Sequence, residues 1–226
     1  MRDLKNLYLR ANACVACHQN IDNGLLKAGH PSLVFELDSQ SINEPKHWRD
    51  DHPWSGARAW LIGQAVALRE AAWRSRTDPD PAPDMQETAM ALAWLLEKVT
   101  SAEPLLPKIL EPDSSDLEAL QRQSDELARA AANWNPNATS ALSLLRVLAG
   151  TESHFVQVKG SSPTSLSYRA KRLVLALDRL AGALSQNQAA LMIANELKVL
   201  QEDVRGPGSL DSARFAEHLG AFRKKL

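Results

Sequence analysis

The sequence predicts an all-α protein. From residue 56 onward, apolar residues recur at spacings of three and four, which is typical of amphipathic helices packed on one another. No convincing strand pattern interrupts them, and prolines and glycines separate the periodic stretches. The 226 residues are 44% hydrophobic and 23% charged, as in ordinary globular proteins. We expect an N-terminal segment over residues 1–55, followed by a helical bundle over 56–226 that packs on it as one unit.

The N-terminal segment differs from the rest of the chain. A short helix is expected from about Asp3 to Ala13, and loops with short helical turns are expected after His18. Turn-forming residues such as Asn23-Gly24 support this expectation, and four of the six histidines lie in this segment.

The remainder predicts a series of helices. The first covers 56–76 and is followed by a proline-rich break. Asp84 is expected to cap the second, and Ser114 or Ser115 the third. A shorter helix over 137–149 ends at Gly150. Beyond a loop at 159–163, two long helices and a final short one follow from the spacing of their leucines and phenylalanines.

The pentapeptide Cys14-Val15-Ala16-Cys17-His18 contains the only two cysteines of the chain. This C-x-x-C-H spacing is the pattern of a c-type haem attachment site. Two thiols on one turn can bond to the two vinyl groups of a haem, and the adjacent histidine can ligate the iron. The pattern therefore predicts one covalent haem c, with His18 as the proximal iron ligand.

Three other interpretations compete with haem. A disulfide between Cys14 and Cys17 would close a very small loop and add little stability. A thioredoxin-like dithiol would require a βαβ setting, which the sequence does not show. A zinc site would need His30 or His47 to complete its ligands, because no other cysteine exists. The haem interpretation is favoured.

The second axial ligand decides the function, because a closed iron transfers electrons and an open one binds small ligands. His30 is the first candidate, since Gly29 frees the backbone before it and Pro31 stiffens the turn after it. His47 is the alternative, and the other histidines are expected at the surface or hydrogen-bonded. Methionines such as Met85 and Met192 are expected in the core rather than on the iron.

Large apolar side chains are needed around a flat cofactor. Trp48, Trp54 and Trp60 follow the haem motif and could form a wall of such a site. They could equally be core residues. Trp48 is included among the cofactor-binding candidates because it adjoins His47.

Residues 1–69 resemble one haem-binding segment of the multihaem cytochromes related to cytochrome c554. Besides the haem motif, the elements that carry the resemblance are Gly29-His30-Pro31, Phe35-Glu36-Leu37, His47-Trp48 and, further on, Gly63-Gln64. The resemblance implies a bis-histidine haem and a role in electron transfer. It departs from the family because a single C-x-x-C-H is present, and the C-terminal bundle has no counterpart in the resemblance.

Charge and hydropathy limit the partners. A net charge of -1 gives no case for nucleic acid binding, and no run of about 18 apolar residues predicts a transmembrane segment. Because c-type haem is attached outside the cytoplasm, we expect a periplasmic or otherwise exported protein. Met1 is followed by a charged stretch rather than a signal peptide, so a processed or excised chain is expected.

The sequence thus favours a cytochrome domain that transfers single electrons between redox partner proteins, other haem-bearing segments or subunits among them. Two alternatives remain open. One is a haem sensor or ligand-binding haem enzyme with an open distal site. The other is a helical interaction module in which the haem is structural.

Overall fold

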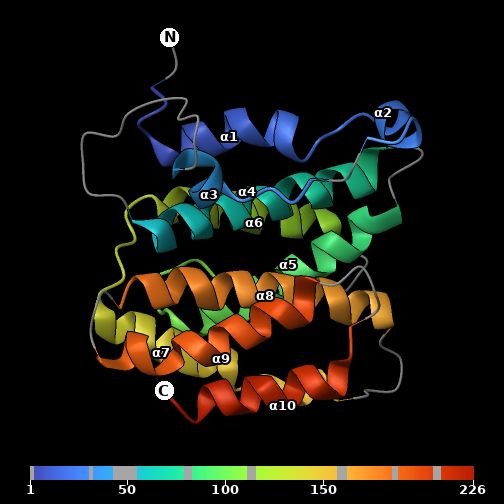
Figure 1. The fold of residues 1–226 in the computed structure, drawn as a ribbon. Helices are drawn as coiled ribbons and strands as arrows, with labels where there is room; N and C mark the ends of the chain where they lie inside the picture. The colour runs from blue at the N-terminus through green and yellow to red at the C-terminus, as the bar shows by residue number, and fades with distance from the viewer. Residues whose placement is uncertain are drawn as a thin grey trace.

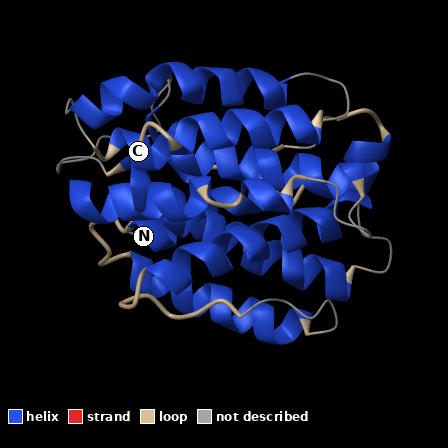
Figure 2. Ribbon diagram, turned by 90° about the horizontal axis from the view of Figure 1, so that it is seen from below, coloured by secondary structure: helices blue, strands red, loops and turns tan. Residues whose placement is uncertain are grey.

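A computed structural model describes residues 3–30, 33–42, 55–78, 83–110, 116–156, 162–184, 188–205 and 210–226. Within these ranges the chain forms α-helices and one short 3-10 helix, with no strand (Figure 2). The all-α prediction is confirmed. The helices are α1 (Leu7–His18), α2 (Asn23–Lys27), α3 (Leu37–Ile42), α4 (Gly56–Thr77), α5 (Pro83–Ala102), α6 (Leu117–Ala131), α7 (Ala138–Ala149), α8 (Pro163–Gly182), α9 (Gln188–Arg205) and α10 (Ser212–Arg223).

Helix α4 is the centre of the half of the molecule that carries α1. It contacts α1, α3, α5, α6 and α8, and the ten consecutive residues 59–68 are all buried. Burial on every side requires an apolar sequence, and residues 59–68 are apolar except for Gln64, whose side chain donates to a backbone carbonyl. Figure 1 shows α1 at one end of the stack of helices and α10 at the other, with α4 and α8 between them.

Several helix boundaries are marked by local residues. Asn137 caps α7 by accepting from the Ser140 amide, and Gly150 follows its last residue, so the expected helix over 137–149 is confirmed. Ser55 caps α4 in the same way.

Other boundaries differ from the prediction. The cap of α6 is Asp116, which accepts from the Ala119 amide, and not Ser114 or Ser115. The candidate cap Asp84 lies inside α5, which begins at Pro83. Helix α1 begins at Leu7, where Asn6 caps its start by accepting from the Leu9 amide, and it continues to His18 instead of ending near Ala13.

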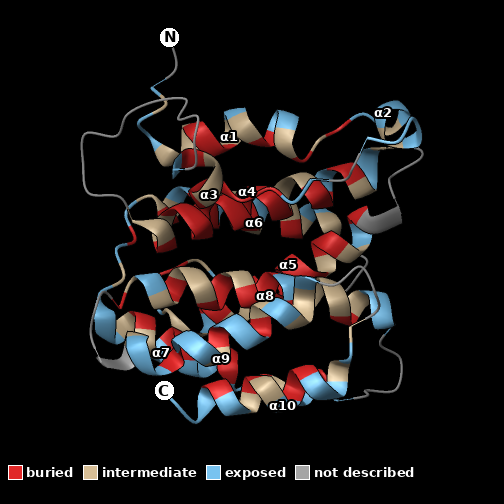
Figure 3. Cartoon of the chain, viewed as in Figure 1, coloured by how far each residue is buried: buried red, intermediate tan, exposed pale blue. Residues whose placement is uncertain are grey.

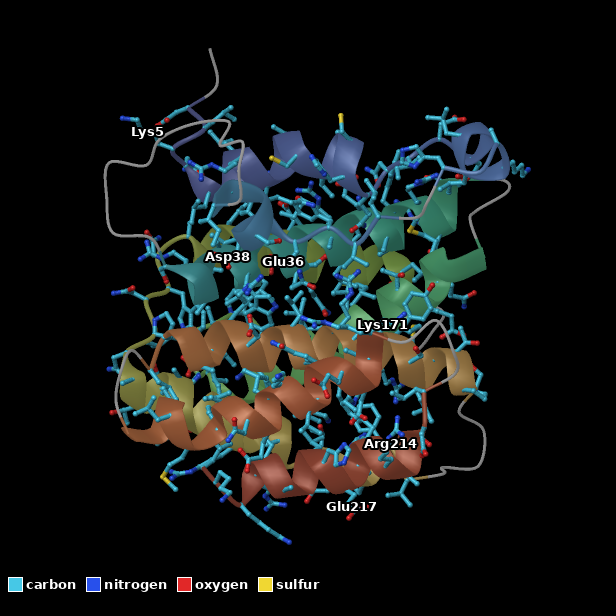
Figure 4. The ribbon with its side chains drawn as sticks, in the orientation of Figure 1. Lys5, Glu36, Asp38, Lys171, Arg214 and Glu217 are labelled. Carbon is cyan, nitrogen blue, oxygen red and sulfur yellow. The ribbon has the colours of Figure 1, made fainter. Side chains whose placement is uncertain are left out.

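A short segment before α3 connects the N-terminal region to the bundle. Phe35 and Leu37, the first residue of α3, are fully buried, and Glu36 is 4% exposed. Figure 3 shows the buried stretch of the neighbouring α4 in red. The Glu36 carboxylate accepts from the amides of Asp38 and Ser39 at 3.1 and 2.7 Å, so it caps the first turn of α3. Arg179 of α8 forms ion pairs with Glu36 at 3.1 Å and Asp38 at 2.8 Å; both carboxylates are labelled in Figure 4.

Gly63 explains how closely this segment approaches α4. A Cβ at Gly63 would lie 2.8 Å from the Leu37 Cβ and 3.1 Å from the Leu37 backbone nitrogen. The next residue, Gln64, donates to the Phe35 carbonyl at 3.4 Å. Two of the sequence elements that carry the resemblance, Phe35-Glu36-Leu37 and Gly63-Gln64, therefore pack against each other.

Candidate haem-attachment site

The cysteines and histidine of the haem motif lie on the last two turns of α1. At 100° per residue, Cys14, Cys17 and His18 fall within an arc of about 100° around the helix. The buried residues Ala11 and Val15, which pack in the core that includes α4, lie directly beside this arc, next to His18. Cys17 is exposed, and Cys14 and His18 are half-buried. The three side chains thus share one arc at the edge of the buried side of α1: Cys17 faces outward, and Cys14 packs partly against the core.

A network of polar contacts fixes the opposite side of α1. Arg69 of α4 donates to Asn12 at 2.5 Å and to Asp125 of α6 at 2.7 Å. The Tyr8 hydroxyl donates to the same Asp125 carboxylate at 2.8 Å, and Arg129 lies over the Tyr8 ring at 4.7 Å. Helix α1 is therefore tied to both α4 and α6 through residues that leave the arc of the motif free of these contacts.

The end of α1 is anchored directly after the motif. The Gln19 side chain is 8% exposed and donates to the Ala67 carbonyl of α4 at 2.8 Å. Asn20 donates to the Glu70 carboxylate at 2.8 Å. Because these contacts hold the residues that follow His18, they fix the position of the last helical turn.

Both thiols are free. Partial burial raises the pKa of the Cys14 thiol, and the nearby Arg10 guanidinium opposes this only in part. Dithiol oxidoreductases use a cysteine whose pKa is lowered, so the environment of Cys14 does not favour the thioredoxin-like interpretation. Within the described ranges, no group of three or more His, Cys, Asp or Glu side chains is arranged to hold a metal ion.

His30 lies in the loop that follows α2, and its side chain is exposed. Gly29 before it has a φ of 98°, in the left-handed region that favours glycine, and the His30 amide donates to the Leu25 carbonyl at 3.0 Å. Gly29 therefore adopts a backbone conformation that few other residues tolerate, as expected from its place before His30. His18 lies at the end of α1 and His30 in the loop after α2, so the two imidazoles come from separate elements.

The remaining candidates divide into three groups. His47, Trp48, His52 and Trp54 lie outside the residues that the structure describes. Trp60 is fully buried in α4 and belongs to the core, and Met85 is 6% exposed. The expectation that Met192 is a core residue is wrong, because its side chain on α9 is 49% exposed.

The two histidines of the bundle have partners. The His218 imidazole lies 2.6 Å from the Asp203 carboxylate, and His154 accepts from the Trp94 indole at 3.4 Å. The expectation of surface or hydrogen-bonded histidines is confirmed for both.

Sequence reasoning did not identify two cations close to the motif. Lys171 and Arg172 of α8 line a pocket together with Gln19, the residue after His18. One feature of the sequence could have indicated that Arg172 is buried: it lies between Ala170 and Leu173 in the apolar stripe of α8.

Comparison of the chain with protein-family models, with curated proteins and with solved structures gave no match. Every helix of the described ranges is too short or too polar to cross a membrane.

The residues present fit a covalently attached haem. Two unpaired thiols and one imidazole share a single arc at the end of a rigidly held helix. Exposed apolar side chains, which a flat apolar cofactor needs, follow the motif at Leu25, Leu33 and Val34, with exposed fractions of 54%, 38% and 59%.

Proposed function

We propose that this protein is a c-type cytochrome domain that carries one covalent haem and takes part in one-electron transfer. The observation that supports it is the common arc of Cys14, Cys17 and His18 at the end of α1, where Cys17 is exposed and Cys14 and His18 are half-buried. The two thiols would hold the haem through thioether bonds, and His18 would be its proximal iron ligand. The haem iron supplies the one-electron chemistry when bound.

In this proposal, the residues of the chain attach the haem, orient it and leave it accessible to partner proteins. The contacts of Gln19 and Asn20 with α4 hold the chain directly after His18, so the backbone that carries the imidazole is fixed before any cofactor is present. Exposed Cys17 gives the side from which redox partner proteins would reach the motif, since they must approach a haem closely to exchange electrons with it.

His30 is the proposed distal ligand, with His47 as the alternative. His30 is exposed and follows a glycine in the left-handed conformation. A bis-histidine iron would favour a lower reduction potential than a His/Met iron. Attachment of the haem implies an exported, for example periplasmic, protein.

Covalent attachment is tested by expressing the chain with a haem-attachment system and measuring the mass of the denatured protein. We expect the mass of one haem to remain on the wild-type chain and to be absent from the Cys14→Ala/Cys17→Ala variant. His218→Ala is the matched control, because His218 is a half-buried histidine paired with Asp203, far along the sequence from the motif. A wild-type chain that retains no haem after denaturation would contradict the proposal.

A further inference from the structure

A pocket of about 260 Å³ opens between the segment before α3, α5 and α8. Its apolar wall consists of Leu33, Val34, Met85 and Leu175. Leu33 and Val34 expose 38% and 59% of their surface, although they belong to the same short segment as the fully buried Phe35. This wall suits an apolar group of modest size, since the pocket is slightly smaller than those that take drug-sized ligands.

The charged lining of the pocket has a single sign. Lys171 and Arg172, adjacent on α8, both line it, and none of its described lining residues is acidic. Lys171 is exposed and is labelled on α8 in Figure 4. The remaining polar groups are the Gln19 amide and the hydroxyls of Thr88 and Tyr168. The pocket therefore combines an apolar wall with two positive charges.

Arg172 is a buried cation whose hydrogen-bonding capacity is only partly used. It is 5% exposed, and its hydrogen bonds to described residues come from Nη1, to the Gln64 side chain at 3.0 Å and to the Phe35 carbonyl at 3.4 Å. No described residue accepts from its Nε or Nη2. Both Nη1 acceptors are uncharged, and the Glu36 carboxylate nearby is paired with Arg179.

A buried charge without a bonded counter-ion is costly. Burial lowers the pKa of Arg172 to about 10, a shift that the Glu36 charge opposes only in part. The guanidinium still carries its proton at neutral pH, so an anion in the pocket would compensate the buried positive charge of Arg172. A carboxylate suits the free edge of a guanidinium, because two N–H groups can bind its two oxygens in parallel.

We propose that this pocket binds a carboxylate carried on an apolar body. Arg172 and Lys171 would hold the carboxylate, and Leu33, Val34 and Met85 would contact the apolar part. Two kinds of molecule carry such a carboxylate. One is a carboxylate side chain of the haem itself, since Gln19 lies in the pocket lining and directly follows His18; this source rests on the proposed function. The other is a free aliphatic carboxylate.

The experiment is a calorimetric titration of the full chain, produced without haem-attachment machinery, with octanoate and with octanol. The two probes have the same apolar chain and differ in charge. We expect octanoate to saturate one site and octanol not to bind. Lys171→Gln should weaken octanoate binding roughly tenfold, because a hydrogen bond to a charged group is lost. Lys198→Gln, at an exposed lysine of α9 outside the pocket, should leave binding unchanged.

Repeating the titration on the haem-loaded chain distinguishes the two sources. Loss of octanoate binding there assigns the pocket to a haem carboxylate, and retained binding assigns it to a free carboxylate. If no haem attaches but octanoate still binds, the proposed function fails while the pocket stands. Equal binding of octanoate and octanol, no octanoate binding in either form, or equal effects of Lys171→Gln and Lys198→Gln would overturn the proposal.

Discussion

Helices α4 and α1 lie against each other but differ in the share of their residues that is buried. In α4, 14 of 22 residues are buried, including the fully buried Trp60. In α1, only 3 of 12 are buried, and the side opposite the buried Ala11 and Val15 carries an exposed cysteine. Packing accounts for most residues of α4. It does not account for Cys17 or for the half-buried His18.

The comparison shows where chemistry can be located in a fold of this kind. Residues whose side chains satisfy the core need no further explanation, because burial alone stabilises them. Reactive or ligating side chains that are exposed or half-buried gain less of this stabilisation. Their presence on α1, between well-anchored neighbours, is the reason for assigning function to this helix and stability to α4.

Trp60→Ala is expected to cause the largest loss of stability, and it tests the assignment of stability to α4 and of function to α1. Trp60 is fully buried, so its truncation should lower the free energy of unfolding by about 3–5 kcal/mol. Trp73→Ala, on the same helix but at a side chain that is 42% exposed, should cost less than about 1 kcal/mol. Urea denaturation followed by far-UV circular dichroism measures both. Equal losses would contradict the assignment of the α4 core.

A smaller loss is expected where the segment before α3 meets α4. Gly63→Ala places a methyl group 2.8 Å from the Leu37 Cβ and close to its backbone, so unfolding should become easier by about 1–3 kcal/mol. Gly220→Ala is the control within α10, where nothing lies within 4 Å of the added Cβ. There alanine should raise stability by up to about 1 kcal/mol, through its higher helix propensity. A neutral Gly63→Ala in the same denaturation assay would disprove the close approach.

Much of α4 and of the bundle could be predicted from the sequence, because the residues that begin, end and bury these helices lie within or next to them in the chain. Ser55, Asn137 and Gly150 mark helix ends within a few residues of the periodic stretches. The extent of α1 could not be predicted in this way. Its end depends on the bond from Gln19 to the Ala67 carbonyl, which joins residues 48 positions apart.

The candidate site shows the same limit. The spacing of Cys14, Cys17 and His18 identifies the motif without a structure, because all three lie within one turn. The buried Arg172 has its partners at Phe35 and Gln64, more than one hundred residues away along the chain. Only the tertiary arrangement reveals that its charge faces a pocket beside the motif.

The contacts that tie α1 to the bundle should depend on pH. Although partial burial of Asp125 opposes it, hydrogen bonds from Arg129, Arg69 and Tyr8 lower the pKa of this carboxyl. A carboxyl whose pKa is lower in the folded state stabilises the fold above its unfolded pKa of about 3.9, and this stabilisation is lost as pH falls through the folded value. Asp125→Asn should therefore cost about 1–2 kcal/mol at pH 7 and less at low pH.

Denaturation of wild type and Asp125→Asn at a series of pH values measures this difference. Parallel curves between pH 7 and pH 3 would show that Asp125 does not link α1 to the bundle through its charge.

The smallest effect on stability is expected at the motif itself. Cys17 is exposed, so Cys17→Ser in the haem-free chain should change the free energy of unfolding by less than about 0.5 kcal/mol. The same variant should lose one of the two covalent bonds to the haem, which mass spectrometry of tryptic peptides detects. A large loss of stability in the haem-free variant would instead give Cys17 a role in packing.

The most direct test of the haem proposal is the visible spectrum of the purified protein, expressed with a haem-attachment system and recorded oxidised and reduced, with and without carbon monoxide. An electron-transfer cytochrome with His18 and a second histidine on the iron predicts sharp low-spin bands that carbon monoxide does not change. His30→Ala should then alter those bands, or His47→Ala if that residue is the ligand. A high-spin spectrum that shifts with carbon monoxide would contradict the electron-transfer assignment and favour a sensor or enzyme, and a protein without haem bands would contradict the account as a whole.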